Sequence, residues 1–313
     1  MIPMKILISD TLEDEGIQIF VRNGFEVIKK FTINKDDLKK EIHEYDGIVV
    51  RSRTKLTAEI LDQASKLKVI GRAGVGLDNI DLLKAKEMNV KVFNTPEAPS
   101  VSVAELSLGL MLALARNISH ADRTMHRGEW NKSQYLGFTL KGKKLGLVGY
   151  GNIAKELASI AIALGMTVGV YSRFSKGQIA IDEAKAVGCS IYPTIEDLLK
   201  EVQIVSLHLP STPQTDNILN KTRIKLMRKD AIIINTARGS LIDENALLNA
   251  LKSKQIAGAA LDVYREEPLK DRRLVEYDEN LILTPHIASQ TIETQTEAAT
   301  TVAKKICDYL NKL

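Results

Sequence analysis

The sequence has little cysteine and no long apolar run. Cys189 and Cys307 are its two cysteines, far apart in a chain of 313 residues. This argues against a disulfide framework or a zinc cluster and is typical of a reducing compartment, so we expect a cytoplasmic protein without a metal site. The apolar stretch at 106–115 is about half of the roughly 20 residues that a membrane-spanning helix needs. The start, MIPMKILISD, turns polar too early for a signal peptide.

The chain also has no large excess of charge of either sign. The net charge is +4, charged residues make up 26% of the chain, and no dense Lys/Arg block occurs. Such a balance gives no reason to expect nucleic acid or a membrane as partner. Apolar residues make up 44%, an average value for a globular protein, and the length allows two domains.

Short apolar runs alternate with helical patterns along most of the chain, which predicts parallel sheets covered on both faces and an α/β fold. The pattern breaks at Thr95-Pro96 and Pro99, where we expect a hinge, and one long helix is expected over 101–128. Other helices are expected from Asp78 and over 292–310. Because the last helix cannot form a domain alone, we expect it to pack on the first one. The expected strands and the remaining helices lie at 5–8, 25–28, 47–50, 68–70, 90–93, 144–148, 166–171, 231–234, 257–261 and 281–283, and at 12–20, 36–42 and 57–64.

The organisation predicted is two Rossmann-like, doubly wound parallel-sheet domains, of which the outer one is discontinuous. The outer domain comprises 1–97 and 287–313, and the inner domain comprises 98–286. The alternation of strand and helix restarts at Lys143 and continues to Thr284. Its first strand leads into Gly149-Tyr150-Gly151-Asn152-Ile153-Ala154, which opens a helix.

This glycine loop lies where a dinucleotide-binding loop is expected. Gly149 permits a tight turn, and Gly151 allows the backbone to approach a pyrophosphate at a helix N-terminus. The third small position is Ala154, which is compact enough for helix packing. The alternative is an ordinary tight turn, but the flanking strand and helix favour a nucleotide.

Two further features qualify this prediction. An acidic residue that holds an NAD ribose should end the second strand, yet Ser172 and Arg173 stand there, so NAD(H) is expected and NADP(H) use stays open. A second glycine loop, Gly74-Val75-Gly76, is followed by Asp78, which looks like a helix cap. Its backbone amides could hold a carboxylate, or the loop could be a simple strand-to-helix turn.

Three polar groups follow three apolar runs of the inner domain: Arg238, the pair Glu266-Glu267, and His286. Because ligands bind outside the carboxyl ends of strands in open α/β sheets, these groups could converge. Each alone is more typical of a salt bridge or a solvated loop. Together they suit hydride transfer from a 2-hydroxy acid: histidine serves as base or acid, a carboxylate orients it, and arginine grips a substrate carboxylate.

The segments GYGNIA, NTARGSLIDENAL, AALDVYREEP and TPHIAS stand in the order and spacing of one family. The chain resembles the D-isomer-specific 2-hydroxyacid dehydrogenases over nearly its whole length. The resemblance implies that Arg238 binds substrate, that Glu267, which directly precedes proline, orients the base, and that His286 is the acid–base group. It also implies cofactor contacts from Asp262 beside the nicotinamide amide, and from Asn152, Ile153, Thr236, Ser289 and the turn His208-Leu209-Pro210.

Within the family, VRSRTK and GRAGVGLDNID are most similar to the D-3-phosphoglycerate dehydrogenases, and no serine-sensing domain is expected after residue 313. Arg51, Arg72 and Lys132 would then meet a phosphate, and Ser52, Gly74 and Val75 a carboxylate. The alternative is that Arg51 and Arg72 are solvated surface residues. The substrate expected is 3-phospho-D-glycerate, oxidised to 3-phosphohydroxypyruvate in serine biosynthesis.

Other functions stay open. A glyoxylate or hydroxypyruvate reductase would share Arg238, Glu267 and His286, and Ser172-Arg173 is similar to NADPH-using members. An NAD-binding corepressor is expected to carry partner-binding surfaces or tails beyond the core, and we expect almost none here. A formate dehydrogenase is disfavoured because that relative lacks the glutamate. The family resemblance also implies a homodimer, and the apolar segment at 106–115 suits a buried helix or a dimer arm.

Overall fold

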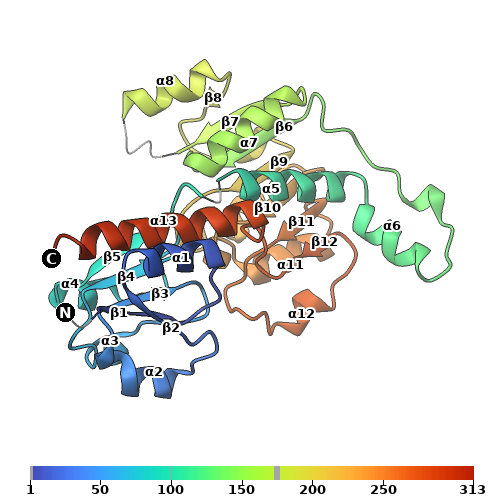
Figure 1. Ribbon diagram of the computed structural model, residues 1–313. Helices are drawn as coiled ribbons and strands as arrows, with labels where there is room; N and C mark the ends of the chain where they lie inside the picture. Colours follow the sequence, from blue (N-terminus) through green and yellow to red (C-terminus); the bar gives the residue numbers. More distant parts are fainter. Residues whose placement is uncertain (1–2, 99, 173–176) are drawn as a thin grey trace. The chain divides into compact units, whose positions relative to one another are not determined.

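The computed structural model describes residues 3–98, 100–172 and 177–313. Within them the chain divides into two compact units, Met1–Pro99 with Ser289–Leu313 (unit 1) and Ser100–Ala288 (unit 2). Each unit is built on a parallel β-sheet, which confirms the α/β fold class (Figure 1). The predicted boundaries, 97/98 and 286/287, stand shortly before the observed ones.

Unit 1 has a five-stranded sheet in the order β2-β1-β3-β4-β5. The order reverses between β1 and β3, which places a topological switch point at their carboxyl ends. The strands are β1 (Lys5–Ile8), β2 (Glu26–Lys29), β3 (Gly47–Val50), β4 (Val69–Arg72) and β5 (Lys91–Asn94). The helical segments are α1 (Asp14–Arg22), α2 (Lys35–Glu41), η1 (Ile42–Glu44), α3 (Ala58–Leu61), α4 (Leu82–Glu87) and α13 (Ile292–Leu310).

The carboxyl-terminal helix α13 is an integral part of unit 1. It lies beside α1, and both helices cover one face of the sheet (Figure 1). A Cβ placed on Gly16 of α1 would lie 2.7 Å from the backbone carbon of Ala299, so the two helices approach closely there. On β4, a Cβ at Gly71 would lie 2.4 Å from Ile306 Cδ1. Because Gly16 and Gly71 have no side chain, α13 can pack closely against α1 and β4.

Unit 2 has a seven-stranded sheet in the order β12-β11-β10-β9-β6-β7-β8, with its switch point between β6 and β9. The strands are β6 (Lys144–Val148), β7 (Thr167–Tyr171), β8 (Ser190–Ile191), β9 (Ile204–Leu207), β10 (Ile232–Asn235), β11 (Gly258–Leu261) and β12 (Leu281–Leu283). The helical segments are α5 (Ser100–Ala115), α6 (Ile118–Met125), η2 (Lys132–Gln134), α7 (Asn152–Ala163), α8 (Gln178–Ala186), α9 (Ile195–Glu201), α10 (Lys221–Ile224), η3 (Gly239–Leu241), α11 (Glu244–Lys252) and α12 (Arg272–Val275).

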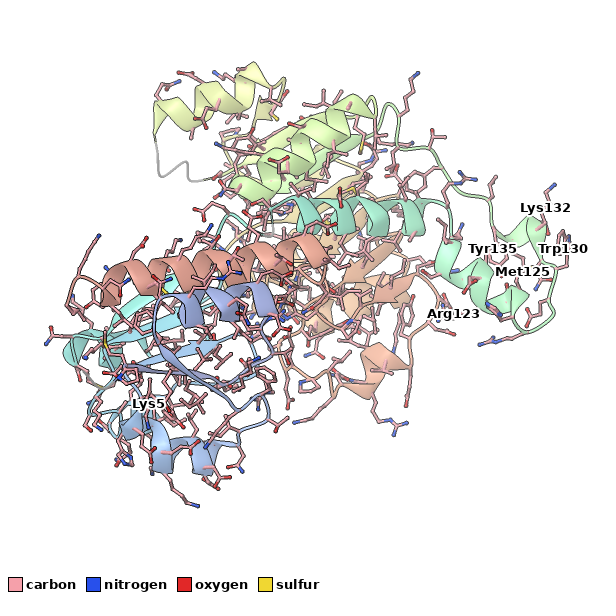
Figure 2. The ribbon with its side chains drawn as sticks, in the orientation of Figure 1. Lys5, Arg123, Met125, Trp130, Lys132 and Tyr135 are labelled. Carbon is pink, nitrogen blue, oxygen red and sulfur yellow. The ribbon has the colours of Figure 1, made fainter. Side chains whose placement is uncertain are left out.

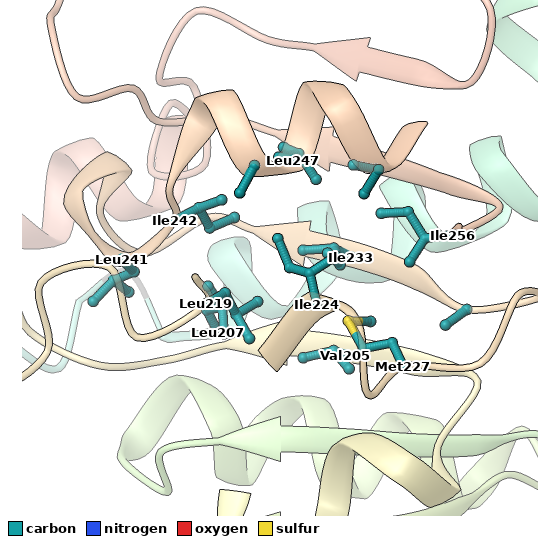
Figure 3. Close-up of a cluster of buried hydrophobic side chains, with 14 of the residues drawn as sticks. Val205, Leu207, Leu219, Ile224, Met227, Ile233, Leu241, Ile242, Leu247 and Ile256 are labelled. Atoms are coloured by element: carbon teal, nitrogen blue, oxygen red, sulfur yellow. The ribbon is translucent and has the colours of Figure 1, made fainter. Parts of the chain in front are cut away.

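The core of unit 2 supports the strand ends that carry the polar groups. Every residue of β9, β10 and β11 is buried, as expected for central strands of a parallel sheet. Figure 3 shows Leu247 of α11 and Ile224 of α10 gathered against Ile233 of β10. A second buried cluster, which includes Met111 of α5 and Leu157 of α7, covers the opposite face.

Two predictions of local structure are wrong. The helix predicted over 101–128 is broken, because Asn117 takes a left-handed conformation with φ 55° and α6 leaves α5 at 64°. The helix predicted from Asp78 begins at Leu82, and the cap is Asp81, whose carboxylate accepts the Lys84 amide. Among the described residues, no single helix is long and apolar enough to cross a membrane, although the bent pair α5 and α6 passes that test by length and composition.

Candidate active site

His286 and Glu267 lie on adjacent strand exits and form a pair. The chain leaves β12 through Thr284-Pro285, and His286 then takes φ 55°, a region that non-glycine residues rarely occupy. Its Nδ1 lies 2.7 Å from Oε2 of Glu267, in the loop after β11. The two side chains are 39% and 38% exposed, so the pair is open on one side. With Nδ1 bound to the carboxylate, Nε2 is the ring atom left to face a substrate.

Glu267 is held as a carboxylate. Burial raises the pKa of its carboxyl, but the hydrogen bonds from His286 and from the Tyr264 amide, together with the charges of His286 and Arg238, outweigh burial. The net pKa therefore lies below the ordinary value. The Tyr264 amide donates to Oε1 at 3.1 Å, which leaves Oε2 to His286. An ionised partner of this kind orients the imidazole and stabilises its protonated form.

Arg238 follows β10 and belongs to the same group of strand ends. Asn235 Nδ2 donates to the Arg238 carbonyl at 2.9 Å, and this bond shapes the turn after the strand. The Arg238 guanidinium donates to the Ala237 carbonyl at 2.6 Å. Its charge also reaches Glu267, whose pKa it lowers. The structure thus brings together Arg238, Glu267 and His286, whereas Glu266 pairs with Lys270 at the surface.

Asp262 faces the segment that carries His286. Its carboxylate is fully buried and accepts the Thr284 hydroxyl at 2.5 Å and the Ile287 amide at 2.9 Å on Oδ1. Oδ2 accepts the Ala288 amide at 2.9 Å. These three bonds come from both sides of His286 and fix the turn. A contact from Asp262 to a nicotinamide amide stays a prediction.

The glycine loop lies at the switch point of the seven-stranded sheet. Gly149 has φ 102°, and a Cβ there would lie 2.3 Å from the His208 carbonyl oxygen, so a side chain would push the two strand exits apart. Gly151 precedes α7, and a Cβ on it would meet no heavy atom within 4 Å. Open space in front of the first amides of α7, at Asn152 and Ile153, suits a pyrophosphate. The residues present therefore fit a dinucleotide.

The other predicted cofactor residues have different surroundings. Burial lowers the pKa of His208 to about 4, and its Nε2 lies 2.8 Å from the Ser206 hydroxyl. Leu209 and Pro210 continue this turn, and the Thr236 hydroxyl pairs with Ser107 at 2.9 Å. The remaining predicted positions are Ser172, directly after β7, Ser289, which belongs to unit 1, and Arg173, which lies outside the described residues.

The predicted substrate residues of unit 1 are Arg72 at the end of β4 and residues on the loops that follow β3 and β4. Asp10, which is buried, accepts the Arg51 amide at 2.6 Å and the Thr54 hydroxyl at 2.7 Å, so the Arg51-Ser52 loop is fixed at the switch point. A Cβ on Gly74 would lie 1.5 Å from an Arg72 guanidinium nitrogen, so that side chain lies against the glycine. The Gly74 amide donates to the Thr95 hydroxyl at 2.8 Å, and the Val75 carbonyl accepts from Asn94.

Lys132, the remaining predicted phosphate contact, belongs to η2 of unit 2. Together with Met125, Trp130 and Tyr135 it belongs to the arm formed by α6 and the segment up to residue 138 (Figure 2). Several residues that shape the sites carry no recognisable pattern in the sequence. Tyr264 donates to the Thr284 carbonyl, Asp10 accepts the Arg51 amide, and Thr284 donates to the Asp262 carboxylate. These partners lie 20, 41 and 22 positions away along the chain, which no local pattern reveals.

The parallel sheet, its glycine loop and the paired groups at its strand ends are typical of the class of dinucleotide-binding α/β proteins that carry out acid–base chemistry, and comparison with known proteins identifies the family. Residues 108–288 match the NAD binding domain of the D-isomer specific 2-hydroxyacid dehydrogenases. The chain belongs to this family. It is 45% identical to D-3-phosphoglycerate dehydrogenase of Methanocaldococcus jannaschii over 303 residues, which is 97% of this chain but 57% of that protein.

Two other relatives match along their whole length. Hydroxypyruvate reductase of Thermotoga maritima is 42% identical over 307 residues, 96% of this chain and 97% of the relative. The structure of an acyclic imino acid reductase (Bsp5) in complex with NADPH and D-Arg has a TM-score of 0.87 at 30% identity, covering 99% of this chain and 98% of that one. The family model, the sequence relatives and the structural neighbours therefore agree on the family. The names of these relatives point to different substrates.

Proposed function

We propose that this chain catalyses hydride transfer between a D-2-hydroxy acid and a nicotinamide cofactor. The observation that carries the proposal is the 2.7 Å contact between His286 Nδ1 and Glu267 Oε2, next to Arg238. The cofactor, when bound, accepts or supplies the hydride. The protein's part is to take the hydroxyl proton on Nε2 of His286, to stabilise the imidazolium through Glu267 and to hold the substrate carboxylate on Arg238.

The substrate we propose is 3-phospho-D-glycerate, oxidised to 3-phosphohydroxypyruvate. Arg51 lies on a loop that Asp10 holds, and Arg72 ends β4 with its guanidinium against Gly74. A phosphate with nearly two negative charges suits such cations. The 45% identity to a phosphoglycerate dehydrogenase supports this choice. The second candidate is hydroxypyruvate reduction, which the 42% identity to a hydroxypyruvate reductase favours.

A substrate panel with both cofactors separates these candidates. Purified protein is assayed with 3-phosphohydroxypyruvate, hydroxypyruvate and glyoxylate, each with NADH and NADPH. Arg51→Ala and Arg72→Ala should raise KM for the phosphorylated substrate about tenfold or more, because charged hydrogen bonds contribute roughly 1.5–3 kcal/mol. KM for hydroxypyruvate should change far less. Equal losses on both substrates would reject phosphate recognition, and no turnover on any of them would reject the enzyme itself.

For the cofactor we propose NAD(H) with relaxed discrimination against NADP(H). The family model describes an NAD binding domain, and a neighbour binds NADPH. Ser172 stands at the end of β7, where a carboxylate would repel a 2′-phosphate. Ser172 can bond to a ribose hydroxyl but carries no charge that repels the phosphate.

We also propose a homodimer that uses the arm of unit 2. Large apolar side chains are exposed there: Met125 is 51% exposed, Trp130 79% and Leu136 92%. Figure 2 shows Met125 and Trp130 on this projecting segment. Exposed apolar residues gathered on one segment are typical of protein interfaces.

A further inference from the structure

The backbone segments that carry Arg238, Glu267 and His286 all contact one residue, Tyr264, to which the sequence analysis assigned no role. Tyr264 follows β11 by three residues, is 8% exposed, and packs on the main core of unit 2. Each part of this residue contacts a different segment: its amide, its carbonyl and its hydroxyl. Tyr264 thus contacts all three segments.

The amide and carbonyl of Tyr264 serve two of these segments. The amide donates to Glu267 Oε1 at 3.1 Å and so fixes the rotation of that carboxylate. A Cβ on Gly239 would lie 1.8 Å from the Tyr264 carbonyl carbon, so the turn that begins at Arg238 packs directly on this backbone. Glycine at 239 is the residue that allows this approach.

The hydroxyl of Tyr264 serves the third segment. It lies 2.8 Å from the Thr284 carbonyl and 3.1 Å from the Leu261 carbonyl, at the point where β12 and β11 end. The same Thr284 carbonyl accepts the His286 amide at 3.0 Å. That bond closes the tight turn in which His286 takes φ 55°. A conformation this unfavourable persists only where its surroundings determine it.

We propose that Tyr264 is a positioning residue for the His286–Glu267 pair, and that its hydroxyl holds the turn on which His286 stands. This inference rests on the proposed function of that pair. The hydroxyl binds the turn through Thr284, while the amide of the same residue binds Glu267, so one rigid residue sets both ends of the 2.7 Å contact. Without the hydroxyl, the turn keeps its bonds to Asp262 and the His286–Glu267 contact but loses its link to the residue whose amide holds Glu267 Oε1.

The chemistry of the hydroxyl suits a permanent donor. Burial raises the pKa of Tyr264 far above its ordinary value, and the charge of Asp262 raises it further, so the group stays protonated throughout the working pH range. It therefore donates to a carbonyl in both directions of the reaction. Asp262 holds the same turn from the other side with three bonds. The fold should thus survive loss of one hydroxyl.

The test is Tyr264→Phe, with Tyr277→Phe as matched control. Tyr277 is also packed on the core of unit 2, and its change removes one hydroxyl away from the pair. For Tyr264→Phe we expect kcat to fall about tenfold, less than the roughly hundredfold that a 1 Å misplacement can cost. The KM for NADH should stay within about twofold, because the glycine loop is untouched. The limb of the pH–rate profile that reports the acid–base group should move to lower pH.

A merely structural tyrosine would lower the melting temperature and leave that limb in place. The proposal is overturned if Tyr264→Phe keeps a wild-type kcat and pH profile, or if Tyr277→Phe shows the same loss. If Tyr264→Phe no longer binds NADH, hydrogen exchange replaces the kinetic measurement: the proposal expects faster exchange of the amides of His286, Ile287 and Ala288 in Tyr264→Phe than in Tyr277→Phe, and equal exchange in the two variants would overturn it. Failure of the proposed function looks different, because then His286→Ala itself stays active.

Discussion

At the scale of single residues, the proposed acid–base group is a histidine in a costly backbone conformation. A non-glycine residue at φ 55° costs of order 1–3 kcal/mol, which its surroundings must offset. Here the buried carboxylate of Asp262 and the Tyr264 hydroxyl bind the flanking residues. The result is an imidazole whose Nδ1 is bound to Glu267 before any substrate arrives, so little reorganisation remains for the reaction.

The first prediction concerns this pair. His286→Ala should reduce kcat by roughly 10²–10⁴, the range typical of a lost acid–base group. Glu267→Gln should leave substrate and cofactor binding largely intact and move the acid–base limb of the pH–rate profile to lower pH, since a neutral amide stabilises an imidazolium less. Steady-state kinetics across pH measure both effects, with Glu266→Gln as control. A His286→Ala enzyme with more than about a tenth of wild-type kcat would exclude this role.

The second prediction concerns Ser172. The wild type should use NADH and NADPH with kcat/KM values within about a hundredfold, a difference of roughly 2.7 kcal/mol. Ser172→Asp should move the ratio toward NADH, because a carboxylate repels the 2′-phosphate. The kcat/KM pair for both cofactors, on both proteins, decides the matter. Arg173 and Lys176, which could pair with that phosphate, lie outside the described residues. Discrimination of about ten-thousandfold by the wild type would mean that another group excludes NADPH.

At the scale of elements, close approach of backbones decides where helices pack. The contact of α1 with α13 requires glycine at position 16, where any Cβ would press on the Ala299 backbone. Backbone cannot rotate away as a flexible side chain can, so the cost falls on the packing of the two helices. This contact joins the last helix of the chain to the first.

The third prediction follows from this contact. Gly16→Ala should lower the free energy of unfolding of unit 1 by roughly 1–3 kcal/mol, despite the better helix propensity of alanine. Gly109→Ala is the matched control: it also lies within a helix, α5, but its Cβ would meet no heavy atom within 4 Å. The control should gain about 0.5–1 kcal/mol. Urea denaturation measures both changes, and hydrogen exchange of the α13 amides reports on Gly16→Ala. Equal effects of the two substitutions on the free energy of unfolding would contradict the packing argument.

The fourth prediction concerns the switch point of unit 2. Burial lowers the pKa of His208 from 6.5 to about 4, so the folded chain keeps this imidazole neutral where the unfolded chain protonates it. The free energy of unfolding should therefore decline as pH falls from about 6.5 toward about 4. His208→Gln removes the titration and should reduce this decline. Denaturant unfolding at about pH 7.5 and about pH 5 compares the two proteins. An unchanged pH dependence would show that His208 does not contribute.

At the scale of the whole molecule, the arm of unit 2 carries apolar side chains that are exposed to solvent in the monomer. The break at Asn117 matters here, because it turns α6 away from the direction of α5. Within the arm, Tyr135 bonds to Thr124 at 2.7 Å, so the segment is internally ordered while Trp130 and Leu136 stay exposed. Burying such side chains in an interface is favourable by roughly 25 cal/mol per Å².

The fifth prediction tests the arm as an interface. Trp130→Ser combined with Leu136→Ser should shift the protein from dimer to monomer, measured by sedimentation velocity over a range of concentrations. The control is Leu83→Ser with Ile292→Ser, because these side chains in unit 1 are 78% and 83% exposed. The control should leave the dimer intact. A wild type that sediments as a monomer at about 10 µM, well above the dissociation constants typical of stable dimers, would reject the proposal.

The sequence by itself determined the fold class and the order of the strands along the chain. Runs such as Ile232–Asn235 are apolar throughout because they are buried on both faces, and glycine at 149 marks a turn that other residues cannot make. Arg238, Glu267 and His286 were found because each follows such a run. These signals are local: they depend on residues within a few positions of one another.

The tertiary structure alone decided what depends on distant residues. The helix predicted over 101–128 looked continuous because its composition stays helical, yet Asn117 breaks it. The 2.7 Å contact joins residues 19 positions apart, and Tyr264 bonds to a carbonyl 20 positions away. The sequence cannot indicate which backbone carbonyl accepts a hydrogen bond, because every residue carries one. Where a buried hydroxyl finds its partner is therefore set by how the strands pair, and local pattern cannot show it.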